Sequence, residues 1–314
     1  MRVGLLLPHF GNRDATHASL NRLPALEHAG LDSVWVRDHL IYAPEIPGDD
    51  GTWVDPFVML AAVAARTSRM TLGTAVLMPH RHPLHLAGLI SSLVWLAGAG
   101  RIIAAFGMGS RSAELSAAGL PEQGRGALLE EQIALVKELW LGEAVTRQGG
   151  RYPLSGVRTT SAPGTASTPL WYGGITDRAV MRAAAHFDGL LLSRLPSDVA
   201  LARAASFRSL REAAGRGPGT VGVVIQASPG RTRAEAYDGI DIDAVMTASA
   251  RFLKTEVSTT DGLLLAGTPG EIAEGLSRLR EDGFEHCVLD LRSRFTAWDR
   301  CADLVLEALA EFRK

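Results

Sequence analysis

Short, nearly continuous apolar runs recur along the chain, and longer segments with helical spacing separate them. Such runs are typical of parallel strands that are buried on both faces. The predicted strands are Arg2–Leu7, Ser33–Val36, Thr71–Leu77, Arg101–Phe106, Leu170–Tyr172, Gly189–Ser193, Gly219–Ala227 and His286–Leu291. The predicted helices include Asp55–Arg66, Arg125–Trp140, Arg178–His186, Ser197–Ala214, Pro269–Asp282 and Ala297–Phe312. Eight alternating units favour a single-domain α/β fold over residues 1–314, a (β/α)8 TIM barrel, with an open doubly wound sheet as the alternative.

Residues at the ends of several units support this division. Gly30 and Gly283 each stand between a helical segment and a strand, where a positive φ ends a helix. Thr268-Pro269-Gly270-Glu271 has the composition of a helix start with a capping box. The uncharged stretch 83–100 contains His85 and ends in glycines, so we interpret it as a buried helix rather than a membrane span.

Two segments add residues to the basic unit of one strand and one helix. Residues 142–168 are rich in Gly, Ser, Thr and Pro and predict a surface insertion, and residues 238–260 predict an extra helix after the seventh strand. Because barrel enzymes keep their sites at the carboxyl ends of the strands, we expect both insertions to form walls there.

Composition narrows the classes of function. A net charge of −2 gives no attraction to nucleic acid or to anionic lipid, so we expect neither as a partner. The two cysteines, Cys287 and Cys301, provide no disulfide framework, and no secretory signal pattern precedes the first strand. We therefore expect a cytoplasmic protein that acts on a small molecule.

Asp38 and His39 follow the second predicted strand. A histidine at this end of a barrel strand can transfer protons near neutral pH, although it can also simply order the loop that follows. Phe10, Tyr42, Trp53 and Trp298 are either pocket aromatics or core residues.

Two glycine-rich segments follow later strands. Gly107-Met108-Gly109-Ser110-Arg111 lets a ligand approach the backbone, or forms a tight turn. Gly173-Gly174-Ile175 precedes a helix start that offers free amides to a phosphate, or is an ordinary turn. The run from His80 to His85 contains Pro83 and no carboxylate, so we assign no metal site.

The ordered motifs together resemble one family over nearly the whole chain. The matching segments are Gly30–Leu40, Asp55-Pro56-Phe57, Leu72–Leu77, Arg81-His82-Pro83, Leu139–Gly142, Gly150-Arg151-Tyr152, Pro169–Gly174 and Gly267-Thr268-Pro269. They are similar to luciferase-like monooxygenases and the related oxidoreductases that depend on the deazaflavin coenzyme F420.

This resemblance implies a redox cofactor, coenzyme F420 or alternatively FMN, at the carboxyl face. His39 would be catalytic, and a strained bulge is common in relatives at the segment that corresponds to Ala75 and Val76. The residues implied to bind the cofactor are Asp38, Ala75, Val76, Gly109, Ser110, Arg111, Gly173, Gly174, Ile175, Ser193 and Arg194. Arg292 and Arg294 would either add charge for an acidic tail or be solvated surface residues.

The sequence departs from the family pattern around the fourth strand. Residues 97–101 read Ala-Gly-Ala-Gly-Arg where relatives carry Ser-Gly-Gly-Arg, and the strand itself is atypical. Many F420-dependent relatives have an acidic residue just beyond the position of Gly109. Here Ser112 stands at about that place and Glu114 is only nearby, which leaves His39 as the main candidate for proton transfer.

Three functions remain open at this point. The first is hydride transfer between F420 and a small organic substrate, and the second is an FMN-dependent monooxygenase supplied with reduced cofactor by a partner reductase. The third is a homologue that binds ligands without redox turnover, which the altered fourth strand motivates. Homodimers are common among relatives, but no feature of the sequence decides the oligomeric state.

Overall fold

The computed structural model describes residues 1–41, 53–109, 111–121 and 123–314. Eight parallel strands form a closed ring in the order β1-β2-β3-β4-β7-β8-β9-β11, because β8 pairs with β9 and β11 returns to β1. The bounds are β1 Arg2–Leu6, β2 Ser33–Val36, β3 Thr71–Thr74, β4 Ile102–Phe106, β7 Leu170–Gly173, β8 Gly189–Ser193, β9 Thr220–Pro229 and β11 His286–Asp290. The predicted (β/α)8 barrel is confirmed, and the open sheet is excluded.

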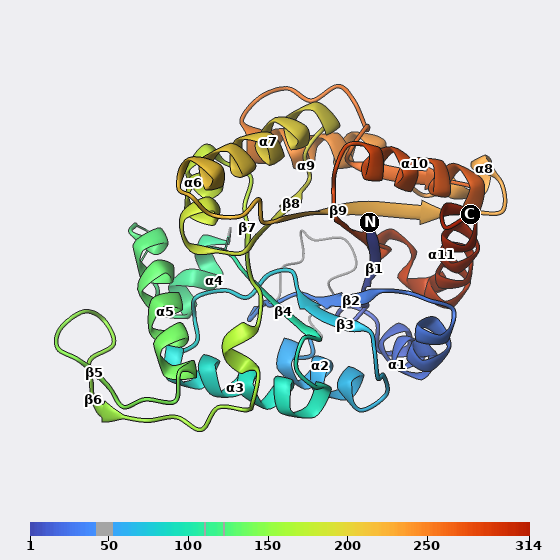
Figure 1. The fold of residues 1–314 in the computed structure, drawn as a ribbon. Helices are drawn as coiled ribbons and strands as arrows, with labels where there is room; N and C mark the ends of the chain where they lie inside the picture. Colours follow the sequence, from blue (N-terminus) through green and yellow to red (C-terminus); the bar gives the residue numbers. More distant parts are fainter. Residues whose placement is uncertain (42–52, 110, 122) are drawn as a thin grey trace.

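Helices surround this ring on the outside (Figure 1). They are α1 Arg13–His28, α2 Pro56–Ala64, α3 Pro83–Ala97, α5 Arg125–Trp140, α6 Asp177–His186, α7 Ser197–Ala213, α10 Pro269–Glu281 and α11 Trp298–Phe312. The expected helix ends are confirmed: Gly30 and Gly283 have φ of 93° and 84°, and Thr268 and Glu271 form a capping box.

Two tryptophans fill the barrel interior. Trp35 on β2 and Trp171 on β7 lie with ring centroids 5.6 Å apart, inside a small cluster that includes Leu6, Leu191 and Val288. The neighbouring strands carry glycine at the same level, because a Cβ on Gly73 would lie 2.3 Å from the Trp35 ring. The interior is therefore a packed core, and ligands can approach it only from its ends.

The third strand ends earlier than predicted. β3 stops at Thr74, and the chain then passes through a cis peptide bond between Ala75 and Val76. Leu77 resumes pairing as an isolated bridge to Phe106. The break lies in the segment for which the resemblance implied a bulge.

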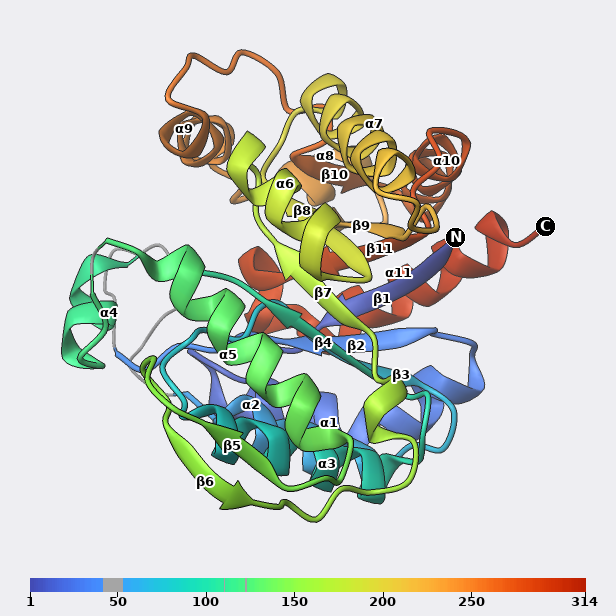
Figure 2. The same ribbon diagram turned by 60° about the vertical axis from the view of Figure 1, so that its left-hand side comes forward.

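The two insertions lie in different places. The extra helix is α9, Ile242–Leu253, which follows the short α8, Arg233–Tyr237, and precedes an added strand β10, Leu264–Gly267, that pairs with the end of β9. Figure 2 shows α9 at the same end of the barrel as α4, Ser112–Ala117, and both termini at the other end. The second insertion thus contributes to the carboxyl face, as expected.

Residues 142–168 form the expected surface insertion, but the insertion starts at the other end of the barrel from the one expected. This segment follows helix α5, which has already carried the chain back toward the amino ends of the strands. Its hairpin, β5 Val145–Arg147 and β6 Leu154–Val157, lies outside the ring of helices beside α5 and α3 (Figure 2). The hydrogen bonds from Thr159 to the Leu139 carbonyl and from the Ala162 amide to Ser91 hold its base there. The base of the segment lies away from the carboxyl face, because a helix rather than a strand precedes it. Its tip runs back toward that face, where Arg151 donates to the Gly119 carbonyl after α4 and Tyr152 meets His82 edge to face.

The uncharged stretch forms α3, whose inner face is buried, but Trp95 and Leu96 at its end are exposed. Among the described residues, no helix combines the length and apolarity needed to cross a membrane.

Candidate active site

Most of the site residues suggested by the sequence lie at one rim of the barrel. His39 follows β2, Gly173 ends β7 and Ser193 ends β8, and all barrel strands are parallel. Their carboxyl ends therefore open on a common face. Ser110 and Tyr42 lie outside the described residues.

His39 is held by a carboxylate that the sequence analysis set aside. Its Nδ1 lies 3.1 Å from Oε2 of Glu114 on α4, and the backbone N–H of Leu40 donates to the other oxygen of the same carboxylate. The Glu114 side chain is 1% exposed, and that of His39 is 20% exposed. Burial opposes ionisation of Glu114, but the hydrogen bonds from His39 and Leu40 and the charge of Arg111 hold its pKa below the usual value. When Nδ1–H donates to Glu114, the Nε2 atom of His39 remains for a ligand.

Asp38 is buried and strongly engaged. Its Oδ2 accepts hydrogen bonds from the Met78 amide at 3.0 Å and from Arg81 at 2.5 Å, and His80 lies 3.7 Å away. Its Oδ1 atom is buried and has no hydrogen-bond partner among the described residues. A buried carboxylate oxygen of this kind is costly unless a donor reaches it.

Small residues surround Val76 at the tips of β3, β4 and β7. A Cβ on Gly107 would lie 2.5 Å from a Val76 methyl group, and one on Gly173 would lie 2.4 Å from the other methyl group. Gly109 has a φ of 71° and lies against Met78. Val76 and these glycines form an arc of small, apolar residues, which leaves room for the face of a planar ring.

The predicted phosphate site at Gly173-Gly174-Ile175 differs from expectation at one backbone amide, that of Gly174. The amide of Gly174 already donates to the Leu191 carbonyl at 3.3 Å, so it is not free for an anion. The helix N-terminus that follows Ile175 supplies the other amides of its first turn, of which Ala179 is capped by Thr176. Asp177, which would repel an anion, pairs with Arg203 on α7.

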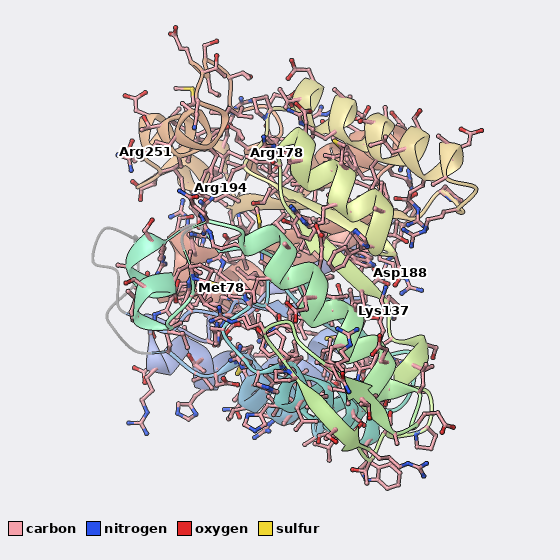
Figure 3. The ribbon with its side chains drawn as sticks, turned by 90° about the vertical axis from the view of Figure 1, so that its left-hand side faces the viewer. Met78, Lys137, Arg178, Asp188, Arg194 and Arg251 are labelled. Carbon is pink, nitrogen blue, oxygen red and sulfur yellow. The ribbon has the colours of Figure 1, made fainter. Side chains whose placement is uncertain are left out.

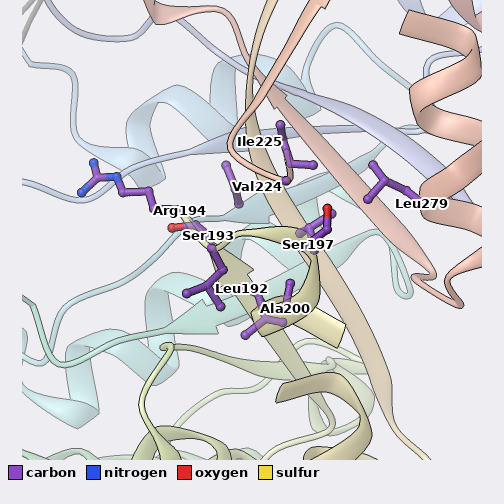
Figure 4. A pocket seen from close by; sticks show the side chains of 11 residues that line it. Leu192, Ser193, Arg194, Ser197, Ala200, Val224, Ile225 and Leu279 are labelled. Atoms are coloured by element: carbon purple, nitrogen blue, oxygen red, sulfur yellow. The ribbon is translucent and has the colours of Figure 1, made fainter. Parts of the chain in front are cut away.

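Ser193 and Arg194 line a small cavity beside the barrel. The cavity lies between β8, β9, α7 and α10, is lined mainly by apolar residues such as Leu192 and Ile225, and has a volume of about 10 Å³. Figure 4 shows Arg194 extending away from the Leu279 side of this cavity. The cavity is smaller than typical ligand pockets, so we do not place a cofactor ring in it.

Arg292 and Arg294 are neither solvated nor free. Arg292 contacts Asp290 at the end of β11, and Arg294 donates to Ser228 and to two backbone carbonyls of α8. Asp290 also pairs with Arg37, at 2.5 Å. Phe10 stacks on Trp53 at 4.4 Å between centroids, and Trp53 meets His39 edge to face at 4.8 Å, whereas Trp298 is a core residue.

Sequence reasoning assigned no role in the site to Arg37, Arg81, Glu114 or Asp290. One signal was available for Arg37: side chains alternate along a strand, so Arg37 continues the inward direction of Trp35. No local pattern pairs His39 with Glu114, which stands 75 residues further on.

Comparison with known proteins agrees with this architecture. Residues 1–286 match the family model described as luciferase-like monooxygenase. The chain belongs to this family.

Within the luciferase-like family, the chain is similar to several F420-dependent enzymes. It is 34% identical over 160 residues to the F420-dependent glucose-6-phosphate dehydrogenase of Amycolatopsis mediterranei, a match that covers 49% of this chain and 45% of that protein. It is 29% identical over 225 residues to the F420-dependent hydroxymycolic acid dehydrogenase of Mycobacterium tuberculosis, covering 70% and 60%. The matches thus span about half the length of these curated relatives.

Solved structures share the fold at low identity. Monooxygenase RslO1 from Streptomyces bottropensis superposes with a TM-score of 0.81 at 22% identity, over 100% of both chains. An F420-dependent secondary alcohol dehydrogenase, in complex with an F420-acetone adduct, superposes with a TM-score of 0.83 at 18% identity, over 100% of this chain and 99% of that chain. A type II Baeyer-Villiger monooxygenase from Pseudomonas putida, in complex with FMN, also shares the fold, with a TM-score of 0.78 at 16% identity over 99% of this chain and 97% of that chain.

Proposed function

We propose that this protein is an oxidoreductase that transfers a hydride between coenzyme F420 and a small organic substrate, with His39 as the proton donor or acceptor. The observation that carries the proposal is the His39–Glu114 pair at the rim of the barrel mouth. Family membership supports a redox cofactor, and the F420-dependent enzymes among the relatives favour the deazaflavin over FMN.

The residues at the mouth fit such a cofactor. Ala75, Val76, Gly107 and Gly109 form the apolar, small-residue arc for the ring, and the unpartnered Oδ1 of Asp38 can accept a hydrogen bond from a ring N–H. The amides after Gly173-Gly174, at Ile175 and the start of α6, would hold the phosphate beside Ser193. A bound deazaflavin supplies a carbon that accepts or releases a hydride.

The side chains of the protein transfer the proton and hold the His39 ring in place. In the oxidative direction, a substrate alcohol loses a hydride from carbon and a proton from oxygen, and His39 Nε2 accepts the proton. Glu114 accepts a hydrogen bond from Nδ1, which fixes the tautomer and stabilises the imidazolium that forms. In the reductive direction the same atom returns the proton.

Cofactor titration tests the choice of cofactor. Purified protein is titrated separately with F420 and with FMN, and binding is followed by absorbance and fluorescence. We expect saturable F420 binding that does not require His39. Tight FMN binding without F420 binding would reject the proposal, and substrate-dependent oxygen uptake with reduced FMN would then favour the monooxygenase alternative.

Replacement of His39 tests its role. His39→Ala should keep F420 affinity within a fewfold and lower the rate of hydride transfer by about 10²–10⁴-fold, the usual contribution of a positioned acid or base. Unchanged turnover would exclude His39 from proton transfer.

A further inference from the structure

Four arginines come together over the barrel mouth from alternate strands of the ring. Arg37 follows β2, Arg111 follows β4, Arg194 follows β8 and Arg292 follows β11. The carboxyl ends of all eight parallel strands open on one face, which explains how residues so distant in sequence come near one another.

The guanidinium groups lie close enough to affect one another. Burial lowers the pKa of Arg37 to about 10, the Asp290 carboxylate opposes that shift, and the charges of Arg194 and Arg111 add to it. Desolvation and Arg111 likewise lower the pKa of Arg194. Arg194 is nevertheless exposed to solvent, so a ligand can reach it.

The carboxylates near these arginines, those of Asp290 and Glu114, already have partners. Asp290 is 5% exposed and its Oδ2 contacts both Arg37, at 2.5 Å, and Arg292, at 2.5 Å. Glu114, the other carboxylate near Arg111, is held by His39 and Leu40. Two carboxylates therefore face four arginines.

Arg111 and Arg194 are the members without a carboxylate partner among the described residues. Arg111 donates to the Ile41 carbonyl at 3.3 Å, and Arg194 lies over the Phe252 ring at 5.0 Å from its centroid. The backbone carbonyl of Arg194 also accepts from Ser249, which fixes α9 beside it. Figure 3 shows Arg194 at the carboxyl face together with Arg178 and Arg251, and Asp188 and Lys137 at the opposite end.

We propose that Arg111 and Arg194, above the Arg37–Asp290–Arg292 cluster, bind an oxoanion carried by the substrate, such as a phosphate or carboxylate group. This inference rests on the proposed function and names the class of its substrate. It assigns Arg111 and Arg194 to the substrate rather than to the cofactor, because the amides that start α6 already provide a separate anion site after β7. Paired guanidiniums bind phosphate and carboxylate groups with charge-assisted hydrogen bonds.

Inorganic phosphate is a suitable probe at constant ionic strength. Its dissociation constant is measured by calorimetry and by ³¹P NMR for the protein alone and for the protein saturated with F420. The variants are Arg111→Gln, Arg194→Gln and Arg194→Lys, and Arg158→Gln is the control because Arg158 lies on the distant β6 hairpin, paired with Glu143. Arg194 has a φ of 58°, and Gln and Lys carry a Cβ as Arg does. The free-energy cost of this backbone conformation is therefore similar in the wild type and in both variants.

We expect phosphate to bind the protein with and without F420, with similar dissociation constants. Arg194→Gln and Arg111→Gln should each weaken binding about tenfold or more, Arg194→Lys should restore most of it, and Arg158→Gln should change nothing. Equal binding by wild type and by both Gln variants would overturn the site. Loss of phosphate binding on saturation with F420 would overturn its assignment to the substrate, because the cofactor's own anion would then occupy the cluster.

F420 binding is followed separately by its absorbance, so the two proposals can fail independently. If F420 does not bind, the hydride-transfer proposal fails, and the comparison of wild type with the Gln variants still decides whether the arginines bind an oxoanion. The saturation arm is then run with FMN.

Discussion

The partners of individual side chains decide what the rim of this barrel can do. His39 and Asp38 are adjacent in sequence, but they engage different groups: His39 meets Glu114, and Asp38 meets Arg81 and the Met78 amide. Glu114 therefore holds the His39 ring, as the proposed proton transfer requires. Arg81, which also pairs with Asp55, fixes Asp38 against the loop after β3.

Changing Glu114 separates positioning from binding. Glu114→Gln can keep an oxygen for only one of its two donors, His39 or the Leu40 amide. We expect turnover to fall about 10–100-fold and the pH–rate profile to move toward lower pH, since the imidazolium loses a neighbouring negative charge. F420 affinity should stay within a fewfold.

The control for this variant is Glu143→Gln, an exposed carboxylate on the far hairpin. A Glu114 variant with wild-type rate and an unmoved pH profile would mean that its hydrogen bond to His39 is only structural.

At the level of elements, the barrel depends on matching large and small residues between strands. Trp35 occupies the interior beside Gly73 on β3, and Trp171 occupies it beside Gly189 and Gly222 on β8 and β9. The sequence predicted each strand from its apolar run, but neighbouring strands had to be identified before the role of the glycines was visible.

Two glycine substitutions test this packing. Gly73→Ala places a Cβ against the Trp35 ring and should lower the free energy of unfolding by about 1–3 kcal/mol, the usual effect of overpacking. Gly88→Ala, in α3 with no atom within 4 Å of the added Cβ, should raise it by about 0.5–1 kcal/mol. Denaturant titration measures both, and equal effects of the two would contradict the packing argument.

For the whole molecule, buried neutral histidines make stability depend on pH. Burial lowers the pKa of His9 to about 4, against the opposing hydrogen bonds to Leu7 and Arg37, and burial with the Arg2 charge lowers that of His286 to about 3. The unfolded chain thus binds protons more readily than the folded chain below about pH 6.5.

We therefore expect full stability near pH 7 and a progressive loss as the pH falls from about 6.5 toward about 4. One pKa unit is worth about 1.4 kcal/mol, so each histidine removes up to about 3 kcal/mol over this range. Thermal melts at pH 7 and pH 5 measure the loss. His9→Gln should reduce the difference between the two melting temperatures, and the exposed His17→Gln should leave it unchanged; a wild-type melting temperature independent of pH would contradict this account.

The sequence by itself determined the alternation of strands and helices and the helix ends at Gly30, Gly283 and Thr268, because these follow from local periodicity and backbone preference. It favoured a closed barrel over an open sheet without deciding between them. It also assigned His39 to the carboxyl rim. Only the tertiary structure decided which residues meet there, and it joined His39 to Glu114 and Arg37 to Asp290. It likewise put the base of the 142–168 segment at the amino end of the barrel, since the direction of the preceding helix decides where the loop begins. Pairing over such sequence distances depends on how the ring closes, and no local pattern encodes that closure.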